Sequence, residues 1–282
     1  MPPTFVLVHG AFANSFSFAP LQAELGLLGH RSAAVDLPGH GFTATYPRAY
    51  QAPQDAAGLA AAPGAIRGVT LDDNAAYLVG VLERAKRNGP VILVSHSRGG
   101  ITATAAANAR PDLIDRLVYV SSWCPVDLDA AAYYAEPEMA GVDPASLALA
   151  AVGNPAELGL LRVNFRTADP KALAALKAAF LADGTDDEFL AFLSTLQPDE
   201  NTDAGTAAHR AQAATWGRIP RTYVRLTDDA SLPPALQDRL IREGDALTPQ
   251  NPYDVHTLPG SHLKWLISPG PAARLLGGLA AG

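Results

Sequence analysis

The chain has 282 residues and a formal net charge of -7, and no run of lysine and arginine in it could follow a phosphate backbone. Hydrophobic residues make up 48% of the chain and charged residues 17%, which excludes a disordered or fibrous protein. We therefore expect a globular protein that does not bind nucleic acid.

The N-terminal sequence and the cysteine content bear on compartment and cofactors. The first residues, MPPTFVLVHG, have no basic region or cleavage site, and no stretch of about 18 apolar residues occurs, so we expect a cytoplasmic protein without a membrane partner. The single cysteine, Cys124, cannot form an internal disulfide, and the seven histidines show no metal-ligand spacing. We expect no metal, no other cofactor and a small-molecule substrate; the oligomeric state stays open.

Short apolar and β-branched runs alternate with helix-like segments along much of the chain. The predicted strands are Thr4–Val8, Arg31–Asp36, Val91–Ser95, Leu117–Ser122, Arg221–Leu226 and Tyr253–Leu258. The predicted helices are Phe18–Leu28, Leu71–Arg87, Gly99–Ala109, Pro233–Arg242 and Ala272–Leu279. The runs FVLV, VILV and LVYV are continuously apolar, as in strands buried on both faces. The pattern predicts an α/β fold, a doubly wound, mostly parallel sheet with helices on both faces.

Two segments depart from this alternation. Thr43–Val69 is rich in alanine, proline and glycine, and we expect a long surface excursion there. Residues 122–220 contain helix-like pieces at Asp169–Leu181 and Asp186–Leu196 and are far too many for a single crossover. We predict a core α/β domain formed by residues 1–121 and 221–282, with residues 122–220 inserted as a helical cap.

The strongest chemical signal is SHSRGG at residues 95–100, between the strand VILV and a helix-like run. It matches the small-x-nucleophile-x-small pattern of a nucleophile elbow, with Ser95 where glycine is usual. A strand that turns sharply into a helix strains its central residue, so small neighbours such as Ser95 and Gly99 are needed. The helix that follows adds free amides and a positive dipole. The pattern predicts that Ser97 is the nucleophile.

A second signal, HGAF at residues 9–12, follows the first strong strand. A turn there can direct the amide of Ala11 to the same point as the amide of Arg98, forming a two-donor oxyanion hole. Arg98 would act through its backbone and not through its charge. His9 precedes this turn, and we expect it to be structural.

The general base and its acid should follow the last two strands. His262, in PGSH at residues 259–262, lies on a loop from which it can reach Ser97, whereas His256 lies within a predicted strand. Asp228 and Asp229 follow the preceding strand, and spacing alone does not choose between them. We expect His30, His40 and His209 to be surface or packing residues, and His96 to point away from the nucleophile.

Taken together, these segments resemble the α/β-hydrolase fold. VLVHGAF, DLPGHG at residues 36–41, SHSRGG, and YVRLTDDASLPPALQ followed by LPGSH are similar to the branch that contains plant methylesterases and hydroxynitrile lyases, and to a bacterial-type esterase. The resemblance covers the sheet-forming parts and leaves the cap unmatched. It implies that Asp229, the last residue of a Thr-x-Asp group, is the acid and that Asp228 fills the variable position. It also assigns the oxyanion donors to Ala11 and Arg98.

The default function is hydrolysis of a carboxylic ester or lactone through an acyl-enzyme on Ser97. Epoxide hydrolases and dehalogenases of this fold use a carboxylate at the elbow, which a serine does not match. The related lyases carry a lysine directly after the catalytic histidine and a threonine near the start, where this chain has Leu263 and Gly10. Both differences argue against cyanohydrin cleavage.

Pocket residues and other activities complete the expectations. Candidate substrate-binding residues are Phe12, Phe16 and Trp123, with Trp216 and Trp265 as further candidates. Three alternatives stay open: a hydroxynitrile-lyase-like enzyme, a cyclase-like enzyme that uses the same pocket without an acyl-enzyme, and a non-catalytic ligand-binding member of the fold.

Overall fold

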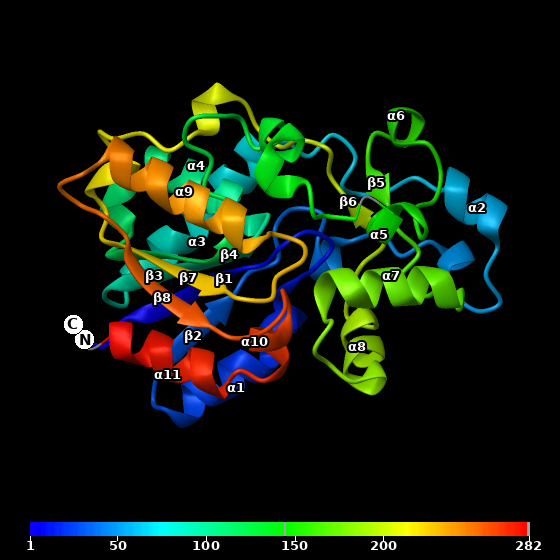
Figure 1. The fold of residues 1–282 in the computed structure, drawn as a ribbon, viewed down its shortest axis with the longest axis horizontal. Coiled ribbons are helices and arrows are strands. Elements are labelled where there is room, and N and C mark those ends of the chain that lie inside the picture. Colours follow the sequence, from blue (N-terminus) through cyan, green and yellow to red (C-terminus); the bar gives the residue numbers. More distant parts are fainter. Residues whose placement is uncertain (144, 281–282) are drawn as a thin grey trace.

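A six-stranded parallel sheet forms the centre of the computed structural model (Figure 1). The structure describes residues 1–143 and 145–280, so residue 144 of the expected cap and residues 281–282 of the expected core lie outside it. In the order β2-β1-β3-β4-β7-β8, the strands are β2 (Arg31–Ala34), β1 (Thr4–Val8), β3 (Val91–Ser97), β4 (Arg116–Ser122), β7 (Arg221–Leu226) and β8 (Asp254–Leu258). The predicted fold class is confirmed.

Helices cover both faces of this sheet. One face carries α1 (Ala19–Leu27), α10 (Lys264–Ile267) and α11 (Gly270–Leu279), and the other carries α3 (Leu71–Lys86), α4 (Gly99–Ala109) and α9 (Pro234–Leu247) (Figure 1). Successive side chains of a strand point to opposite faces, so Phe5 packs with Leu21 of α1 while Val6 packs with Leu78 of α3. Burial on both faces explains why these strands are continuously apolar.

The ends of the predicted elements shift by a few residues. The helix expected to end at Arg242 continues to Leu247, and the strand expected to end at Ser95 continues to Ser97. Thr70 and Asp73 form a capping box at the start of α3, as Thr185 and Glu188 do at α8 (Asp186–Leu193). Short 3₁₀ helices span Ser15–Phe18, Gly41–Thr43, Arg48–Tyr50, Pro111–Leu113, Ala132–Ala135, Pro137–Met139, Ala207–His209 and Trp216–Arg218.

The chain between β4 and β7 forms an insert of mixed structure. It contains α5 (Ala145–Ala148), α6 (Pro155–Leu158), α7 (Pro170–Phe180) and α8, together with a two-stranded antiparallel sheet of β5 (Leu161–Arg162) and β6 (Asp199–Glu200). The expected cap was helical only; the two strands are too short to leave a periodic pattern in the sequence. The surface excursion before α3 contains a further helix, α2 (Ala56–Ala61). The expected domain boundaries stay a prediction.

The strand order places the insert and the loops that follow β1 and β3 at one edge of the sheet. The chain passes from β1 to β2 on one side and then to β3 on the other side of β1. In open parallel sheets such a reversal opens a crevice at the carboxyl ends of the two strands between which the order reverses, here β1 and β3. In Figure 1 the arrowheads of β7 and β8 point toward α7 and α8, so the insert lies beside that edge.

A buried ion pair ties the small sheet of the insert to the surface excursion. The guanidinium of Arg162 pairs with both carboxylate oxygens of Asp199, at 2.6 and 2.7 Å. It also donates to the carbonyls of Leu59 and Ala62, each at 2.7 Å. Because both charges are buried, each depends on the other for its solvation.

Replacing Asp199 by Asn should therefore lower the free energy of unfolding by about 3–5 kcal/mol, because it leaves the buried Arg162 guanidinium without a counter-charge. Urea unfolding followed by circular dichroism measures this loss. Asp186→Asn, which breaks a pair on the surface with Lys177, is the control and should cost less than about 1 kcal/mol. An equal loss in the two variants would contradict the prediction.

Candidate active site

The turn between β3 and α4 holds Ser97 in a strained conformation. Its φ is 52°, in the left-handed region that residues other than glycine rarely adopt. The hydroxyl of Ser122 and the amide of Trp123 both donate to the carbonyl of Ser97, at 2.9 and 3.0 Å. These bonds from the end of β4 hold the strained peptide in place. Arg98 then serves as the N-cap residue of α4.

The loop after β1 lies directly against this turn. A Cβ atom on Gly99 would lie 2.4 Å from the carbonyl oxygen of His9, and one on Gly10 would lie 2.8 Å from Cβ of Ser97. Side chains at either position would push the two segments apart. The absence of a Cβ at both glycines therefore brings Ala11 and Arg98 to the rim of one cavity, which both residues line.

His262 and Asp229 form a buried pair at the same edge. Nδ1 of His262 lies 2.5 Å from Oδ2 of Asp229. The Ser121 hydroxyl donates to the same oxygen at 2.6 Å, and the amides of Ser231 and Leu232 donate to Oδ1, each at 2.8 Å. These donors stabilise the charged carboxylate, which in turn orients the His262 ring.

The neighbouring carboxylate of Asp228 points elsewhere. Asp228 is exposed, and its Oδ2 accepts from the Gly260 amide at 3.1 Å and from the Thr227 hydroxyl at 2.7 Å. The structure thus brings Asp229, and not Asp228, to His262. The chain turns at residues 227 and 228, directly after β7, and this turn directs the two carboxylates to different surroundings.

His96 lies against the His262 ring. The two ring centroids are 4.5 Å apart, and Nε2 of His96 donates to the carbonyl of His262 at 3.1 Å. Burial, followed by the nearby charge of His262, lowers the pKa of His96 well below its usual value. We expected His96 only to point away from Ser97; the structure adds that it packs on His262 and lines the cavity.

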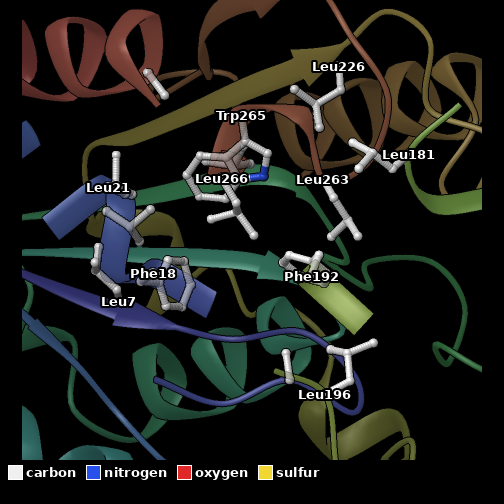
Figure 2. Packing of buried hydrophobic residues seen from close by; sticks show 14 of the residues in the cluster. Leu7, Phe18, Leu21, Leu181, Phe192, Leu196, Leu226, Leu263, Trp265 and Leu266 are labelled. Carbon is white, nitrogen blue, oxygen red and sulfur yellow. The ribbon is translucent and has the colours of Figure 1, made fainter. Parts of the chain in front are cut away.

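The cavity has a volume of about 220 Å³, and Ser97 and His262 both line it. Its walls are mainly apolar and include Phe12, Phe18, Trp123, Phe180, Phe192 and Leu266. Several of these side chains belong to the core cluster beside the sheet, where residues of α8 and α10 meet those of the first helix (Figure 2). An apolar wall of this kind suits a substrate with hydrocarbon or aromatic groups.

The expectation for Phe16 needs correction. Phe12 and Trp123 line the cavity, whereas Phe16 is 52% exposed and packs against Phe42 on the surface. Phe16 lies in a 3₁₀ turn, where successive residues point about 120° apart, so Phe18 faces inward and Phe16 outward. The two further tryptophan candidates, at positions 216 and 265, belong to the core and do not line this cavity.

A buried group of charges behind the turn was not expected. Oε2 of Glu200 accepts from the Phe12 amide at 2.8 Å and from Nε2 of His40 at 3.2 Å. Burial alone would raise the pKa of Glu200, but the charge and hydrogen bond of His40 and the charge of Arg98 lower it to about 2. Burial alone would lower the pKa of His40. The charge and hydrogen bond of the adjacent Glu200 carboxylate have the larger combined effect, so the pKa of His40 is raised.

Sequence patterns carry little trace of this group. Glu200 lies in the run QPDEN, and a polar run within an insert ordinarily indicates a solvent-exposed segment. His40 stands in DLPGHG, which the resemblance singled out without giving the histidine a role.

Within the described ranges, no group of three or more histidine, cysteine or acidic residues could hold a metal ion. The helices described there all fall short of the length and apolar character needed to cross a membrane. Cys124 is buried and accepts from the Tyr253 hydroxyl at 3.2 Å.

A parallel sheet with a strained serine at a strand-to-helix turn, beside a buried histidine and aspartate, is the architecture of α/β hydrolases. The profile of the alpha/beta hydrolase family matches residues 5–273, and the chain belongs to this family. Methylesterase 9 of Arabidopsis thaliana is 26% identical over 234 residues, which cover 81% of this chain and 80% of the relative. The alpha-hydroxynitrile lyase of the same plant is 32% identical over 121 residues, which cover 43% and 40% of the two chains. The predicted resemblance to this branch is confirmed.

Solved structures show the same fold. The crystal structure of polyneuridine aldehyde esterase superposes with a TM-score of 0.71, covering 99% of this chain and all of the other, at 19% sequence identity. The chain is therefore an α/β hydrolase whose relatives include esterases.

The contribution of the Glu200–His40 pair to stability should depend on pH. The pKa of Glu200 is lowered from 4.5 to about 2, so its contribution is complete above about pH 4.5 and is lost as the pH falls toward 2. The pKa of His40 is raised from 6.5, so its contribution is complete below that pH and is lost as the pH rises through the folded value.

The wild type should therefore exceed Glu200→Gln in unfolding free energy by the largest margin between about pH 4.5 and 6.5. Urea unfolding of both proteins across a pH series measures the margin. A margin that stays constant from about pH 3 to pH 8 would contradict the ion pair.

Proposed function

We propose that the protein is a serine hydrolase that cleaves a carboxylic ester or lactone through an acyl-enzyme on Ser97. The observation that carries this proposal is the 2.5 Å pair of His262 and Asp229 at a cavity that the strained Ser97 also lines. A buried aspartate that orients a histidine beside a serine is the arrangement from which serine nucleophiles are activated.

In the proposed reaction, Ser97 Oγ attacks the substrate carbonyl while Nε2 of His262 accepts the hydroxyl proton. The amides of Ala11 and Arg98 donate to the oxyanion, and Asp229 stabilises the imidazolium through Nδ1. The intermediate then collapses, the bond to the alcohol oxygen breaks, and His262 returns the proton to the leaving alcohol. In the second half of the reaction, His262 takes a proton from a water molecule, which attacks the acyl-enzyme. The bond between the acyl carbon and Ser97 Oγ then breaks, His262 returns the proton to Oγ, and the acid is released.

The mainly apolar wall of the cavity supports a substrate with apolar groups on the carbonyl or the alcohol. Its volume of about 220 Å³ exceeds that of a simple methyl ester of a short acid, and aromatic side chains form much of the wall. A library of aryl and branched alkyl esters and lactones is therefore a suitable first screen.

The proposed acyl-enzyme is favoured over cyanohydrin cleavage by two features of the site. A threonine in place of Gly10 would bring its Cβ within 2.8 Å of Cβ of Ser97, so the turn leaves no room for the residue that the lyases carry. Leu263 lines the cavity where those enzymes have lysine, and Nζ of Lys264 instead lies 3.7 Å from Glu188. Cyanide release from mandelonitrile would favour the lyase alternative.

Replacement of Ser97 by Ala should abolish ester hydrolysis, with a loss on the order of 10⁶-fold in kcat, because the covalent step disappears. Turnover of the best ester from the screen and labelling by a fluorophosphonate probe measure this loss. The variant should unfold at a urea concentration no lower than that of the wild type, because the substitution removes only a hydroxyl group and leaves the turn intact. More than about a tenth of wild-type kcat in the variant would contradict a nucleophilic Ser97. Failure of the wild type to react with the probe would favour a cyclase-like enzyme or a non-catalytic binding protein.

The two adjacent aspartates provide a matched pair of variants. Asp229→Asn should lower kcat by about 10⁴-fold, because the amide no longer stabilises the imidazolium or fixes the His262 tautomer. Asp228→Asn removes a charge from an exposed side chain and should change kcat by less than about threefold. Steady-state assays measure kcat of both variants, and circular dichroism checks that both are folded. An inactive Asp228→Asn beside an active Asp229→Asn would reverse the assignment.

A further inference from the structure

The carboxylate of Glu200 joins the two loops that carry the proposed oxyanion donors. Glu200 ends β6 in the insert and is 3% exposed. Its Oε2 accepts from the amide of Phe12, the residue after Ala11, at 2.8 Å. Its Oε1 lies 3.7 Å from Nε of Arg98. A single side chain of the insert therefore contacts both sides of the proposed oxyanion hole.

The same segment of the insert holds the other side of Phe12. The amide of Gln197 donates to the carbonyl of Phe12 at 2.9 Å, so both backbone polar groups of that residue bond to residues 197–200. Phe12 has a φ of 58°, which an aromatic residue adopts only when its surroundings enforce it. The bonds to residues 197–200 thus help to hold Phe12 in this strained conformation, directly beside Ala11.

Arg98 is anchored to the insert as well. Its guanidinium donates to Oδ1 of Asn201 at 2.6 Å and to the carbonyl of Asp203, in addition to its ion pair with Glu200. The backbone amide of Asn201 in turn donates to Oε1 of Glu200 at 2.9 Å. The carboxylate of Glu200 therefore also helps to hold the side chain of Arg98, whose backbone amide is the second proposed donor.

The charge of Glu200 is balanced close by. His40 donates from Nε2 to Glu200 and from Nδ1 to the carbonyl of Pro38, at 3.2 Å each. Both partners are acceptors, and an imidazole ring donates from both nitrogens only in its protonated form. With Arg98, two cations face one carboxylate. Glu200 can therefore fix the loops without adding a net negative charge where an oxyanion would form.

We propose that Glu200 is a positioning residue that holds the backbone amides of Ala11 and Arg98 in register for the oxyanion. This inference rests on the proposed function, which makes those amides the oxyanion donors. Glu200 also lines the cavity, but both of its carboxylate oxygens already accept hydrogen bonds from protein groups. A positioning role therefore predicts a loss of transition-state stabilisation with little change in substrate binding.

Kinetics of Glu200→Ala and Glu200→Gln on the best ester test the proposal. The alanine variant should lose about 100-fold in kcat, the cost of a misplacement of roughly 1 Å, while KM changes less than about threefold. Glutamine retains an oxygen for the Phe12 amide, so it should restore kcat to within about tenfold of the wild type. Glu243→Gln makes the same chemical change at a glutamate that pairs with Arg239 and accepts from Tyr133, and should leave kcat unchanged.

Amide hydrogen exchange of residues 9–13 gives a second readout that needs no substrate. Loss of the Glu200 acceptor should speed exchange of this segment by about tenfold or more in the alanine variant, less in the glutamine variant, and not at all in Glu243→Gln. If the alanine variant does not fold, the glutamine variant carries both measurements.

The outcomes separate this inference from the proposed function. Three results for a folded Glu200→Ala would each overturn the positioning role: a kcat within about twofold of the wild type, a rise in KM as large as the fall in kcat, or unchanged hydrogen exchange of residues 9–13. A wild type that hydrolyses no ester and leaves Ser97 unlabelled would overturn the proposed function instead. In that case the exchange of residues 9–13 still decides whether Glu200 holds the loop.

Discussion

The contact between the loop after β1 and the turn after β3 is the constraint on which the rest of the site depends. The carbonyl of His9 lies so close to Gly99 that a Cβ atom at position 99 would be only 2.4 Å from the carbonyl oxygen. β1 and β3 are paired in parallel along the whole of β1, with Val8 opposite Ser95, so the segments that follow the two strands emerge side by side. Since both strands are buried on both faces, the loops cannot separate without disturbing the sheet.

A second constraint is the solvation of buried charge. Glu200 and Asp229 are both removed from water, and each is stabilised by backbone amides and by a histidine. An unpaired carboxylate in such a place would take up a proton instead of keeping its charge. Both carboxylates therefore depend on hydrogen-bond donors that the surrounding loops hold in fixed positions. Each histidine is oriented by its own acid, His262 at the rim of the cavity and His40 behind it.

Much of the sheet and the position of Ser97 could be predicted because their signals are local. A continuously apolar run bounded by small residues specifies a buried strand, and the serine directly after VILV has one steric interpretation. The choice of Asp229 over Asp228 needed the family resemblance, because adjacent residues share their spacing. Glu200 could not be found in this way: its partners, Phe12 and His40, are more than 150 positions distant, and local sequence says nothing about such pairs. Phe16 was misjudged because a 3₁₀ turn rotates each side chain away from its neighbour.

The bonds between the insert and the loop after β1 limit how the enzyme can be recombined with its relatives. Inserts of this fold shape the pocket, and exchanging one between homologues is an attractive route to new substrate ranges. Here residues 197–203 contact Phe12, Arg98 and the start of α3, through the bond from the Leu71 amide to Asp203. A chimera that replaces the whole insert would lose these bonds along with the old pocket wall. A crossover placed before residue 197 would change α5 to α8 and still retain them.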